Sequence, residues 1–335
     1  MSTQEHPLLT IASPVYGTAA LVGELTDRIC AAARRITDDF EVLLVEDGSP
    51  DDSWAAIARE CDRNPRVKGI RLSRNFGQHP AITAALQHAR GDYVVILDCD
   101  LQDDPGDIPA LFEKCRAGFD IVFARKRVRQ FGWWKNVTAR IYYAIFRWLA
   151  DVDYDPQIGS YSIVSRRVVD AFLQFGDYRR GYVVVLYWLG FSRGYVDVDH
   201  QPRAGGKSGY SAWRLLGHAL TLALAYSEKP LHLAIYVGTM LSVLSFVFGS
   251  WFIVHYYTSN VGQMALGWTS LIISQLFLSG LILIGLGVIG LYVGRVFEQV
   301  KHRPIFVVRE TRNVSHAAGT AASERAVSSR PSALV

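Results

Sequence analysis

A long stretch without charged side chains constrains this chain more than any other feature. From Pro230 to Gly294 the sequence contains no Asp, Glu, Lys or Arg. Residues 231–255 and 269–293 are apolar runs, each long enough to cross about 30 Å of hydrocarbon as a helix. Nothing else in the chain is large enough to bury two such helices, so a pair of membrane-spanning helices is predicted.

Basic residues at both ends of this stretch predict its orientation. Lys229 precedes the pair, Arg295, Lys301 and Arg303 follow it, and the connector between the two runs has neither Lys nor Arg. The positive-inside rule then places both ends in the cytoplasm. Residues 1–16 lack the basic and apolar regions of a signal peptide. We therefore expect a multi-pass protein of the cell inner membrane with both termini in the cytoplasm.

Two further segments are predicted to lie on the membrane surface. Residues 134–150 and 212–227 combine aromatic and apolar side chains with Lys and Arg, a pattern typical of interfacial amphipathic helices. The expected domains are then a cytoplasmic domain at 1–228, the two spans within 229–297, and a cytoplasmic segment with a disordered tail at 298–335.

The first 125 or so residues alternate short apolar runs with amphipathic stretches, which indicates an α/β fold with parallel strands. Several strands are apolar almost throughout, as expected for strands buried on both faces. The expected strands are Leu8–Ser13, Phe40–Glu46, Val67–Leu72, Tyr93–Asp98 and Asp120–Ala124, and the expected helices are Leu21–Ile36, Ser53–Cys61, His79–Ala89 and Asp107–Ala117.

Carboxylates gather directly after the fourth expected strand. Asp98 and Asp100 stand at alternate positions, and Gln102 and two more aspartates follow them. Such oxygens suit Mg²⁺ or Mn²⁺, usually with phosphate oxygens completing the coordination shell. Asp47 follows the second strand and is expected at the same sheet edge, where ligands of open α/β sheets bind. Cys99, between the two carboxylates, is expected to be a small buried side chain.

Several motifs resemble those of one enzyme family. They are Val45–Ser49 (VEDGS), Ser73–Gly77 (SRNFG), Asp98–Asp103 (DCDLQD), and Arg203–Tyr210 (RAGGKSGY) ahead of Lys229-Pro230-Leu231. Together with the C-terminal spans they resemble the polyprenyl-phosphate glycosyltransferases of glycosyltransferase family 2, such as dolichol-phosphate mannose synthase and bactoprenol glucosyl transferase. The resemblance runs from about Leu8 to Arg309 and implies the GT-A fold.

The resemblance implies a role for each matching residue. Asp98, Asp100 and Gln102 would hold the metal, and Pro14, Tyr16, Asp47 and Asp98 would bind the nucleotide sugar. The expected catalytic residues are Asp100, Arg125 and Arg203. A third set would bind phosphate or lipid: Arg127, Lys135, Lys207 and Ser208. Guanidinium groups suit phosphate oxygens, although attraction to anionic lipid headgroups accounts equally well for Arg127.

Two departures from the family pattern bear on function. Gly17-Thr18-Ala19 follows Tyr16 where many relatives carry acidic residues, which leaves the nucleobase open between uracil and thymine. Ser160 stands where relatives often carry an aspartate that has been proposed as a base. A phosphate acceptor needs no such base, because its second pKa is about 6 and its oxygen already carries charge. Direct displacement would then invert the anomeric centre.

The expected activity is therefore metal-dependent, inverting transfer of a sugar from a UDP- or dTDP-linked donor to polyprenyl (undecaprenyl) phosphate at the cytoplasmic membrane face. A non-catalytic scaffold or flippase partner, a transferase with an acceptor that lacks phosphate, and a processive synthase are the alternatives. The Q-x-x-R-W box of processive synthases is absent. The resemblance also implies a homo-oligomer, a tetramer in close relatives. The formal net charge of only +4 gives no reason to expect a nucleic-acid partner.

Overall fold

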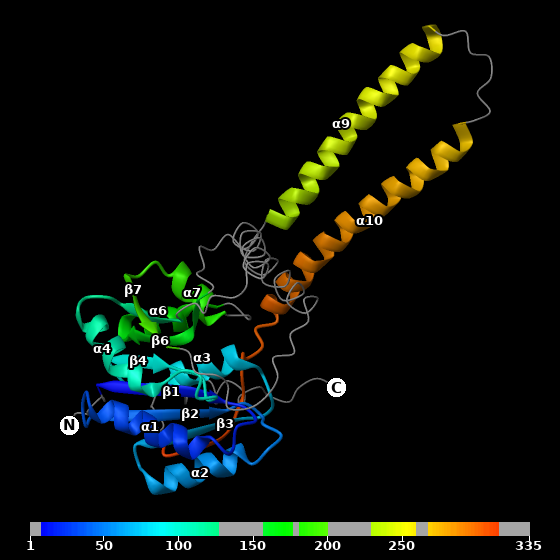
Figure 1. Ribbon diagram of the computed structural model, residues 1–335. Helices are drawn as coiled ribbons and strands as arrows, with labels where there is room; N and C mark the ends of the chain where they lie inside the picture. The colour runs from blue at the N-terminus through cyan, green and yellow to red at the C-terminus, as the bar shows by residue number, and fades with distance from the viewer. Residues whose placement is uncertain (1–7, 127–156, 177–180, 200–228, 259–266, 315–335) are drawn as a thin grey trace, which may run out of the picture.

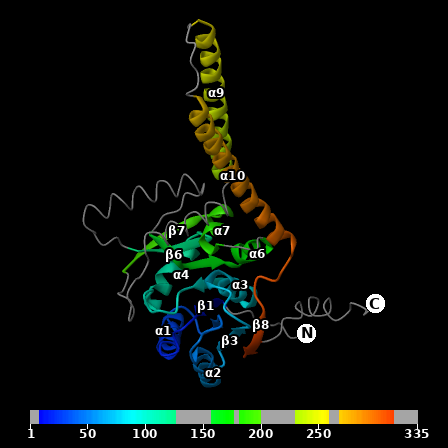
Figure 2. The same cartoon turned by 90° about the vertical axis from the view of Figure 1, so that its right-hand side faces the viewer.

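The computed structural model describes residues 8–126, 157–176, 181–199, 229–258 and 267–314. A layered α/β domain lies at one end, and two long helices project from it (Figures 1 and 2). The eight strands form a single sheet in the order β7-β5-β6-β4-β1-β2-β3-β8. Their bounds are β1 Leu9–Val15, β2 Phe40–Glu46, β3 Val67–Leu72, β4 Tyr93–Ile96, β5 Ile121–Lys126, β6 Ile158–Ser165, β7 Arg193–Val198 and β8 Val308–Arg312.

The sheet is mixed in strand direction. β1 pairs in parallel with β2 on one side and with β4 on the other, and β2 pairs in parallel with β3. β6 runs antiparallel between β4 and β5, and β8 runs antiparallel along the outer edge of β3. Because the chain winds outward from β1 to β3 and then returns to β4, the strand order reverses between β1 and β4. Ligands of open α/β sheets bind at such a switch point.

Helices cover both faces of the sheet and bury a hydrophobic core on each. Core residues of α1, α2 and α4 pack on one face, and those of α3, α6 and α7 pack on the other. In α1, apolar residues three or four positions apart, such as Leu25 and Ile29, form the buried stripe. The helices are α1 Val22–Arg34, α2 Ser53–Arg63, α3 Gln78–His88, α4 Ile108–Arg116, α6 Arg166–Gln174 and α7 Tyr182–Trp188, with a 3-10 turn at Pro105–Asp107.

The α/β architecture expected from the sequence is confirmed. β2 and β3 have the expected bounds, whereas β1 continues to Val15 and β4 already ends at Ile96. The four expected helices agree with α1 to α4 within two residues at each end. No sequence pattern predicted β6, α6, α7 and β7, or β8, which lies in residues 298–335, where a cytoplasmic segment and a disordered tail were expected.

The two long helices are α9 Lys229–Thr258 and α10 Gly267–Val300, and they lie side by side. Both extend beyond the expected spans. By length and composition, one stretch among the described residues could cross a membrane, Phe277–Val300, and Ile235–Phe248 is a shorter apolar helix. The expected surface helices at 134–150 and 212–227 and the tail after residue 314 lie outside the described residues.

Candidate active site

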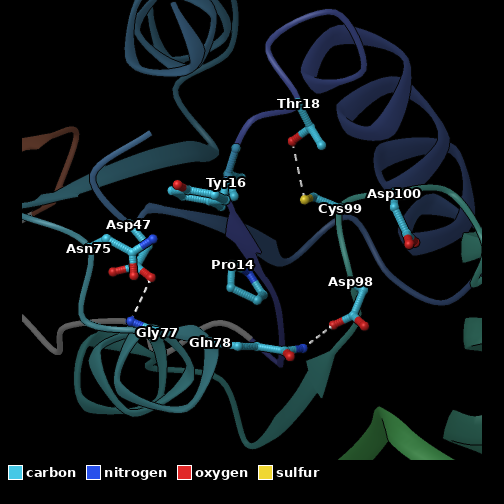
Figure 3. Close-up of a pocket in the computed structure, with 11 residues that line it drawn as sticks. Pro14, Tyr16, Thr18, Asp47, Asn75, Gly77, Gln78, Asp98, Cys99 and Asp100 are labelled. Atoms are coloured by element: carbon cyan, nitrogen blue, oxygen red, sulfur yellow. Dashed lines mark hydrogen bonds between the residues drawn. The ribbon is translucent and has the colours of Figure 1, made fainter. Parts of the chain in front are cut away.

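A cleft of about 270 Å³ opens at the carboxyl ends of β1, β2 and β4, at the switch point of the sheet (Figure 3). The end of β1 and the residues that follow it form one wall, and the loop between β3 and α3 forms another. The segment after β4 completes the cleft. Its lining residues are Pro14, Val15, Tyr16, Thr18, Asp47, Asn75, Gly77, Gln78, Asp98, Cys99 and Asp100. The sequence therefore predicted five of these residues: Pro14, Tyr16, Asp47, Asp98 and Asp100.

Asp47 fixes the wall that comes from the β3–α3 loop. Its two carboxylate oxygens accept hydrogen bonds from the backbone amides of Phe76 and Gly77, both at 2.8 Å. The side chain is 3% exposed, and burial raises its pKa while these two bonds oppose the rise. Gly48 makes the approach of the two segments possible, because a Cβ there would lie 2.3 Å from the amide nitrogen of Asn75. Asp47 thus shapes the cleft as well as lining it.

Asp98 is held from two sides. Its Oδ1 accepts a hydrogen bond of 2.6 Å from Gln78 Nε2 and one of 2.9 Å from Ser160 Oγ (Figure 3 shows the first). Gln78 is the first residue of α3, and Ser160 lies in β6. The two bonds fix the orientation of the carboxylate at the cleft. Ser160 therefore orients Asp98.

Negative charge is concentrated around Asp98. Burial and the neighbouring carboxylates of Asp103 and Asp100 raise the pKa of Asp98 to about 6, against the hydrogen bond from Ser160. Burial also raises the pKa of Asp103, which is 5% exposed. Lys126 Nζ lies 3.7 Å from Asp103 Oδ1 and balances part of this charge.

A sharp turn presents Asp100. Leu101 has a φ of +58°, the left-handed region that a branched side chain rarely adopts, and its side chain is 8% exposed in the core. The amide of Gln102 donates a 3.1 Å hydrogen bond back to Asp100 Oδ1. Gln102 is not among the residues that line the cleft, so the structure brings together two of the three expected metal ligands.

The residues at this edge fit a divalent cation. Among the described residues no group of three or more His, Cys, Asp or Glu side chains forms a complete metal site. Asp98 and Asp100 nevertheless offer hard carboxylate oxygens in the cleft, and the neighbouring carboxylate of Asp103 pairs with Lys126. Cations such as Mg²⁺ and Mn²⁺ prefer this donor type and commonly take the remaining ligands from phosphate and water.

The end of β1 supplies the opposite wall. Tyr16 is 50% exposed and presents its ring at the cleft beside Pro14 (Figure 3). Thr18 Oγ1 donates a 3.2 Å hydrogen bond to Cys99 Sγ. Cys99 was expected to be a buried filler, but it is only partly buried and lines the cleft. The reason is that β4 ends at Ile96, two residues earlier than predicted, so Cys99 belongs to the turn.

Arg125, one of the expected catalytic residues, is not among the residues that line the cleft. Its Nε donates a 2.6 Å hydrogen bond to Asp197 Oδ1 in β7, and its guanidinium lies over the ring of Tyr195. Neighbouring side chains of a strand point to opposite faces, so Lys126, one residue later, is the one that approaches the acidic cluster. The other expected cationic and phosphate-binding residues, Arg203, Arg127, Lys135, Lys207 and Ser208, lie outside the described residues.

The sequence missed Gln78, Ser160 and Lys126 as partners of the acidic cluster. Gln78 directly follows the SRNFG motif, so the motif itself was the available signal. Ser160 was noted only as a departure from the family pattern, and Lys126 had no signal, because only the pairing of β6 with β4 and β5 brings them to Asp98 and Asp103.

Comparison with known proteins identifies the family. Residues 10–172 match the model of glycosyl transferase family 2. An uncharacterised glycosyltransferase of Synechocystis is 34% identical over 90% of this chain and 95% of its own length. A bactoprenol glucosyl transferase of Shigella phage SfV is 33% identical over 82% of this chain and 89% of its own length. The undecaprenyl-phosphate 4-deoxy-4-formamido-L-arabinose transferase of Aeromonas hydrophila is 28% identical over 92% and 95%.

Among solved structures, mannosyl-3-phosphoglycerate synthase from Rubrobacter xylanophilus is 19% identical, with a TM-score of 0.48 over 67% of this chain and 74% of that one. The motifs, the mixed α/β sheet with its cleft at the switch point, and relatives that match over most of their length agree with one another. The chain therefore belongs to glycosyltransferase family 2 and is a glycosyltransferase enzyme.

Proposed function

We propose that this glycosyltransferase moves a sugar from a nucleotide diphosphate donor to polyprenyl phosphate at the cytoplasmic face of a membrane, with inversion at the anomeric carbon. The observation that carries the proposal is the pair Asp98 and Asp100 in a cleft at the switch point of the sheet. The acceptor is suggested by full-length relatives that are named for bactoprenol and undecaprenyl phosphate.

In this proposal the donor nucleotide occupies the cleft. Tyr16 offers an exposed aromatic face for the base, and Asn75 offers amide groups for hydrogen bonds from the opposite wall. Each oxygen of Asp47 has a lone pair left after its bond to the loop and can accept a hydrogen bond from the base or ribose. In this proposal the donor is UDP- or dTDP-linked, the two kinds of nucleotide that the sequence leaves open.

Asp98 and Asp100 would hold Mg²⁺ or Mn²⁺ against the donor diphosphate. When bound, the cation neutralises charge on the departing diphosphate. The protein itself holds Asp98 in one orientation through Gln78 and Ser160, and it holds Asp100 on the turn at Leu101. Preorganisation of this kind lowers the cost of reorganising charged groups during the reaction.

The acceptor phosphate supplies its own charged nucleophile, so the protein must align it and reduce repulsion between two anions. Among the described residues, Lys126 is the cation nearest the acidic cluster, and it would share this role with the expected Arg203, Arg127, Lys135, Lys207 and Ser208. The absence of a carboxylate at position 160 agrees with transfer to a phosphate, because an alcohol acceptor would need a base.

We further propose that α9 and α10 both span the bilayer, with both chain ends in the cytoplasm. The charge-free stretch and the long exposed apolar surfaces of the two helices support this. Surface helices at 134–150 and 212–227 would place the cleft near the lipid phosphate. Assembly into a homo-oligomer, a tetramer by resemblance, is part of the same proposal.

The test is Asp100→Ala, with Asp38→Ala as the matched control. Asp38 is an exposed aspartate in the turn before β2, at the opposite end of the strands from the cleft. Membranes that contain each variant receive a UDP- or dTDP-sugar, Mn²⁺ and polyprenyl phosphate, and mass spectrometry follows the lipid-linked sugar. We expect loss of product in Asp100→Ala only, and loss with a chelator in the wild type. Unchanged turnover in Asp100→Ala would refute the metal site.

The acceptor is tested separately with dephosphorylated polyprenol. Transfer to the free alcohol at a comparable rate would favour a transferase with a different acceptor. Absence of turnover with every donor, together with absence of metal-dependent nucleotide binding, would favour a non-catalytic scaffold.

A further inference from the structure

The segment Pro304–Val314, which follows the long helix α10, folds back onto the α/β domain. We call this segment the strap. It contains β8, and it runs along the outer edge of β3 (Figures 1 and 2, orange to red). The strap therefore connects an apolar helix to a sheet edge that lies on the far side of β1 and β2 from β6.

The strap is fastened along its whole length. β8 pairs with β3 in an antiparallel register in which Ile70 faces Thr311 and Leu72 faces Val308. At its end, Asn313 Nδ2 donates hydrogen bonds of 2.8 Å to Cys61 O and 2.9 Å to Val67 O. Three apolar side chains of the strap pack against the second core cluster: Phe306, Val308 and Val314. Such a set of contacts makes the strap part of the domain.

The strap also contacts the loop that forms one wall of the cleft. The amide of Ser73 donates a 2.9 Å hydrogen bond to Val307 O, where β3 ends and the β3–α3 loop begins. Asp47 binds the same loop from the inside through Phe76 and Gly77. The loop is thus held between a carboxylate of the cleft and a backbone carbonyl of the strap.

A shift of this loop would change the hydrogen bonding of Asp98. Gln78, which ends the loop and begins α3, donates the 2.6 Å hydrogen bond to Asp98 Oδ1. Asn75 and Gly77 line the cleft from the same loop. A continuous set of contacts therefore runs from Val307 through the loop to the proposed metal ligand.

The position of α10 is linked to the same set. Its last turn is attached to the domain, because Gln299 Nε2 donates a 2.8 Å hydrogen bond to Gly176 O. Only residues 301–307 separate the end of α10 from β8, and seven residues can span at most about 25 Å. The strap therefore cannot take up large movements between the helix and the sheet edge.

We propose that the strap is a positioning element of the donor site, which holds the Ser73–Gln78 loop in the conformation that shapes the cleft and orients Asp98. Deletion or disruption of the strap would loosen this loop and weaken donor binding, while the rest of the sheet stays folded. The inference rests on the proposed function only in taking the cleft as the donor site. The coupling between strap and loop stands independently of it.

The test disrupts β8 in the full-length protein with Glu310→Pro/Thr311→Pro. Successive N–H groups of a strand point in opposite directions, so one of the two prolines removes a ladder donor whichever way the strand faces. The matched control is Glu310→Ala/Thr311→Ala, which changes the same side chains and keeps both backbone donors. A second variant, Asn313→Gly, keeps the positive φ of +57° at that position and removes only the clamp to Cys61 and Val67.

Hydrogen exchange in detergent or nanodiscs reads out the coupling. In the double-proline variant we expect the amides of β8, Phe76 and Gly77 to exchange about tenfold faster or more, with a smaller effect in Asn313→Gly. Amides of β1, β2 and β4 should keep their protection, which shows that the domain is folded. The alanine control should match the wild type. Fast exchange in β8 with unchanged exchange at Phe76 and Gly77 would overturn the proposal.

Kinetics and ligand protection separate the strap from the proposed function. With UDP-glucose or dTDP-glucose and Mn²⁺, we expect KM for the donor to rise severalfold in the double-proline variant, with little change in KM for polyprenyl phosphate. If neither nucleotide sugar slows exchange of the loop in the wild type, the cleft is not the donor site, and the exchange data still decide whether the strap holds the loop. A loosened loop with an unchanged donor KM would refute the strap's part in donor binding.

Discussion

The substitution Gly48→Ala tests how the cleft is built. Gly48 has a φ of +63°, and an added Cβ would lie 2.3 Å from Asn75 N and 2.4 Å from the carbonyl carbon of Arg74. The left-handed backbone costs an alanine about 1–2 kcal/mol. Both close atoms belong to the backbone, so the loop must move. This movement would weaken or break the two hydrogen bonds that the backbone amides of the loop donate to Asp47. Hydrogen bonds to a charged group contribute about 1.5–3 kcal/mol each, which gives about 4–8 kcal/mol in total.

Gly190→Ala is the matched control. Gly190 has a φ of +71°, and nothing lies within 4 Å of its added Cβ, so this substitution carries the backbone cost without the collision. For a domain of this size about 1 kcal/mol corresponds to about 2–4 °C in the melting temperature. Thermal unfolding of the purified proteins, followed by tryptophan fluorescence, should show a loss of about 2–8 °C for Gly190→Ala and a larger loss, of at least about 8 °C, for Gly48→Ala. Equal losses would refute the close packing of the loop against Gly48.

Three further predictions concern single residues in the cleft or next to its two aspartates. Leu101→Gly should be at least as stable as Leu101→Ala in thermal unfolding, because glycine removes the cost of about 1–2 kcal/mol that a left-handed backbone imposes on alanine. A markedly less stable glycine variant would contradict the positive φ at this position. N-ethylmaleimide at pH 8 should modify Cys99 before the other three cysteines, which are buried, as peptide mass spectrometry can show. UDP- or dTDP-glucose with Mn²⁺ should slow the modification of Cys99, because Cys99 lines the cleft. If neither donor protects Cys99, the result would argue against nucleotide binding in the cleft. Ser160→Ala should lower the transfer rate about tenfold without a change in KM for polyprenyl phosphate, because Asp98 loses one of its two hydrogen bonds. A raised KM for polyprenyl phosphate would instead indicate that Ser160 contacts the acceptor.

Much of the parallel half of the sheet could be predicted from the sequence. Strands such as β2 are buried on both faces and read as continuous apolar runs, and α1 carries an apolar stripe at helical spacing. These patterns are visible in the local sequence because the position of a residue within its strand or helix decides whether its side chain is buried. β8 gave no such signal, since four of its five residues are charged or polar and the strand is held by its backbone on the edge of β3.

The candidate site also contains residues that the sequence indicated and residues that it did not. Asp98 and Asp100 follow an apolar strand and could be recognised, whereas Ser160 and Lys126 come from β6 and β5, and only the antiparallel insertion of β6 brings them near. Arg125 shows the limit most clearly. Its type and place in the sequence indicated a phosphate ligand, but no local pattern could show that it bonds to Asp197 or that the next residue, Lys126, approaches Asp103.

The sequence by itself determined the enzyme family, the parallel strands and the two cleft aspartates, Asp98 and Asp100. Motifs and apolar periodicity each lie within a short segment of the chain, so they can be recognised without the tertiary structure. Tertiary structure alone decided how Asp98 is oriented, that Lys126 approaches Asp103, and how the segment after α10 joins the domain. These contacts join residues tens to hundreds of positions apart, and side-chain direction at each depends on strand register, which no local pattern records.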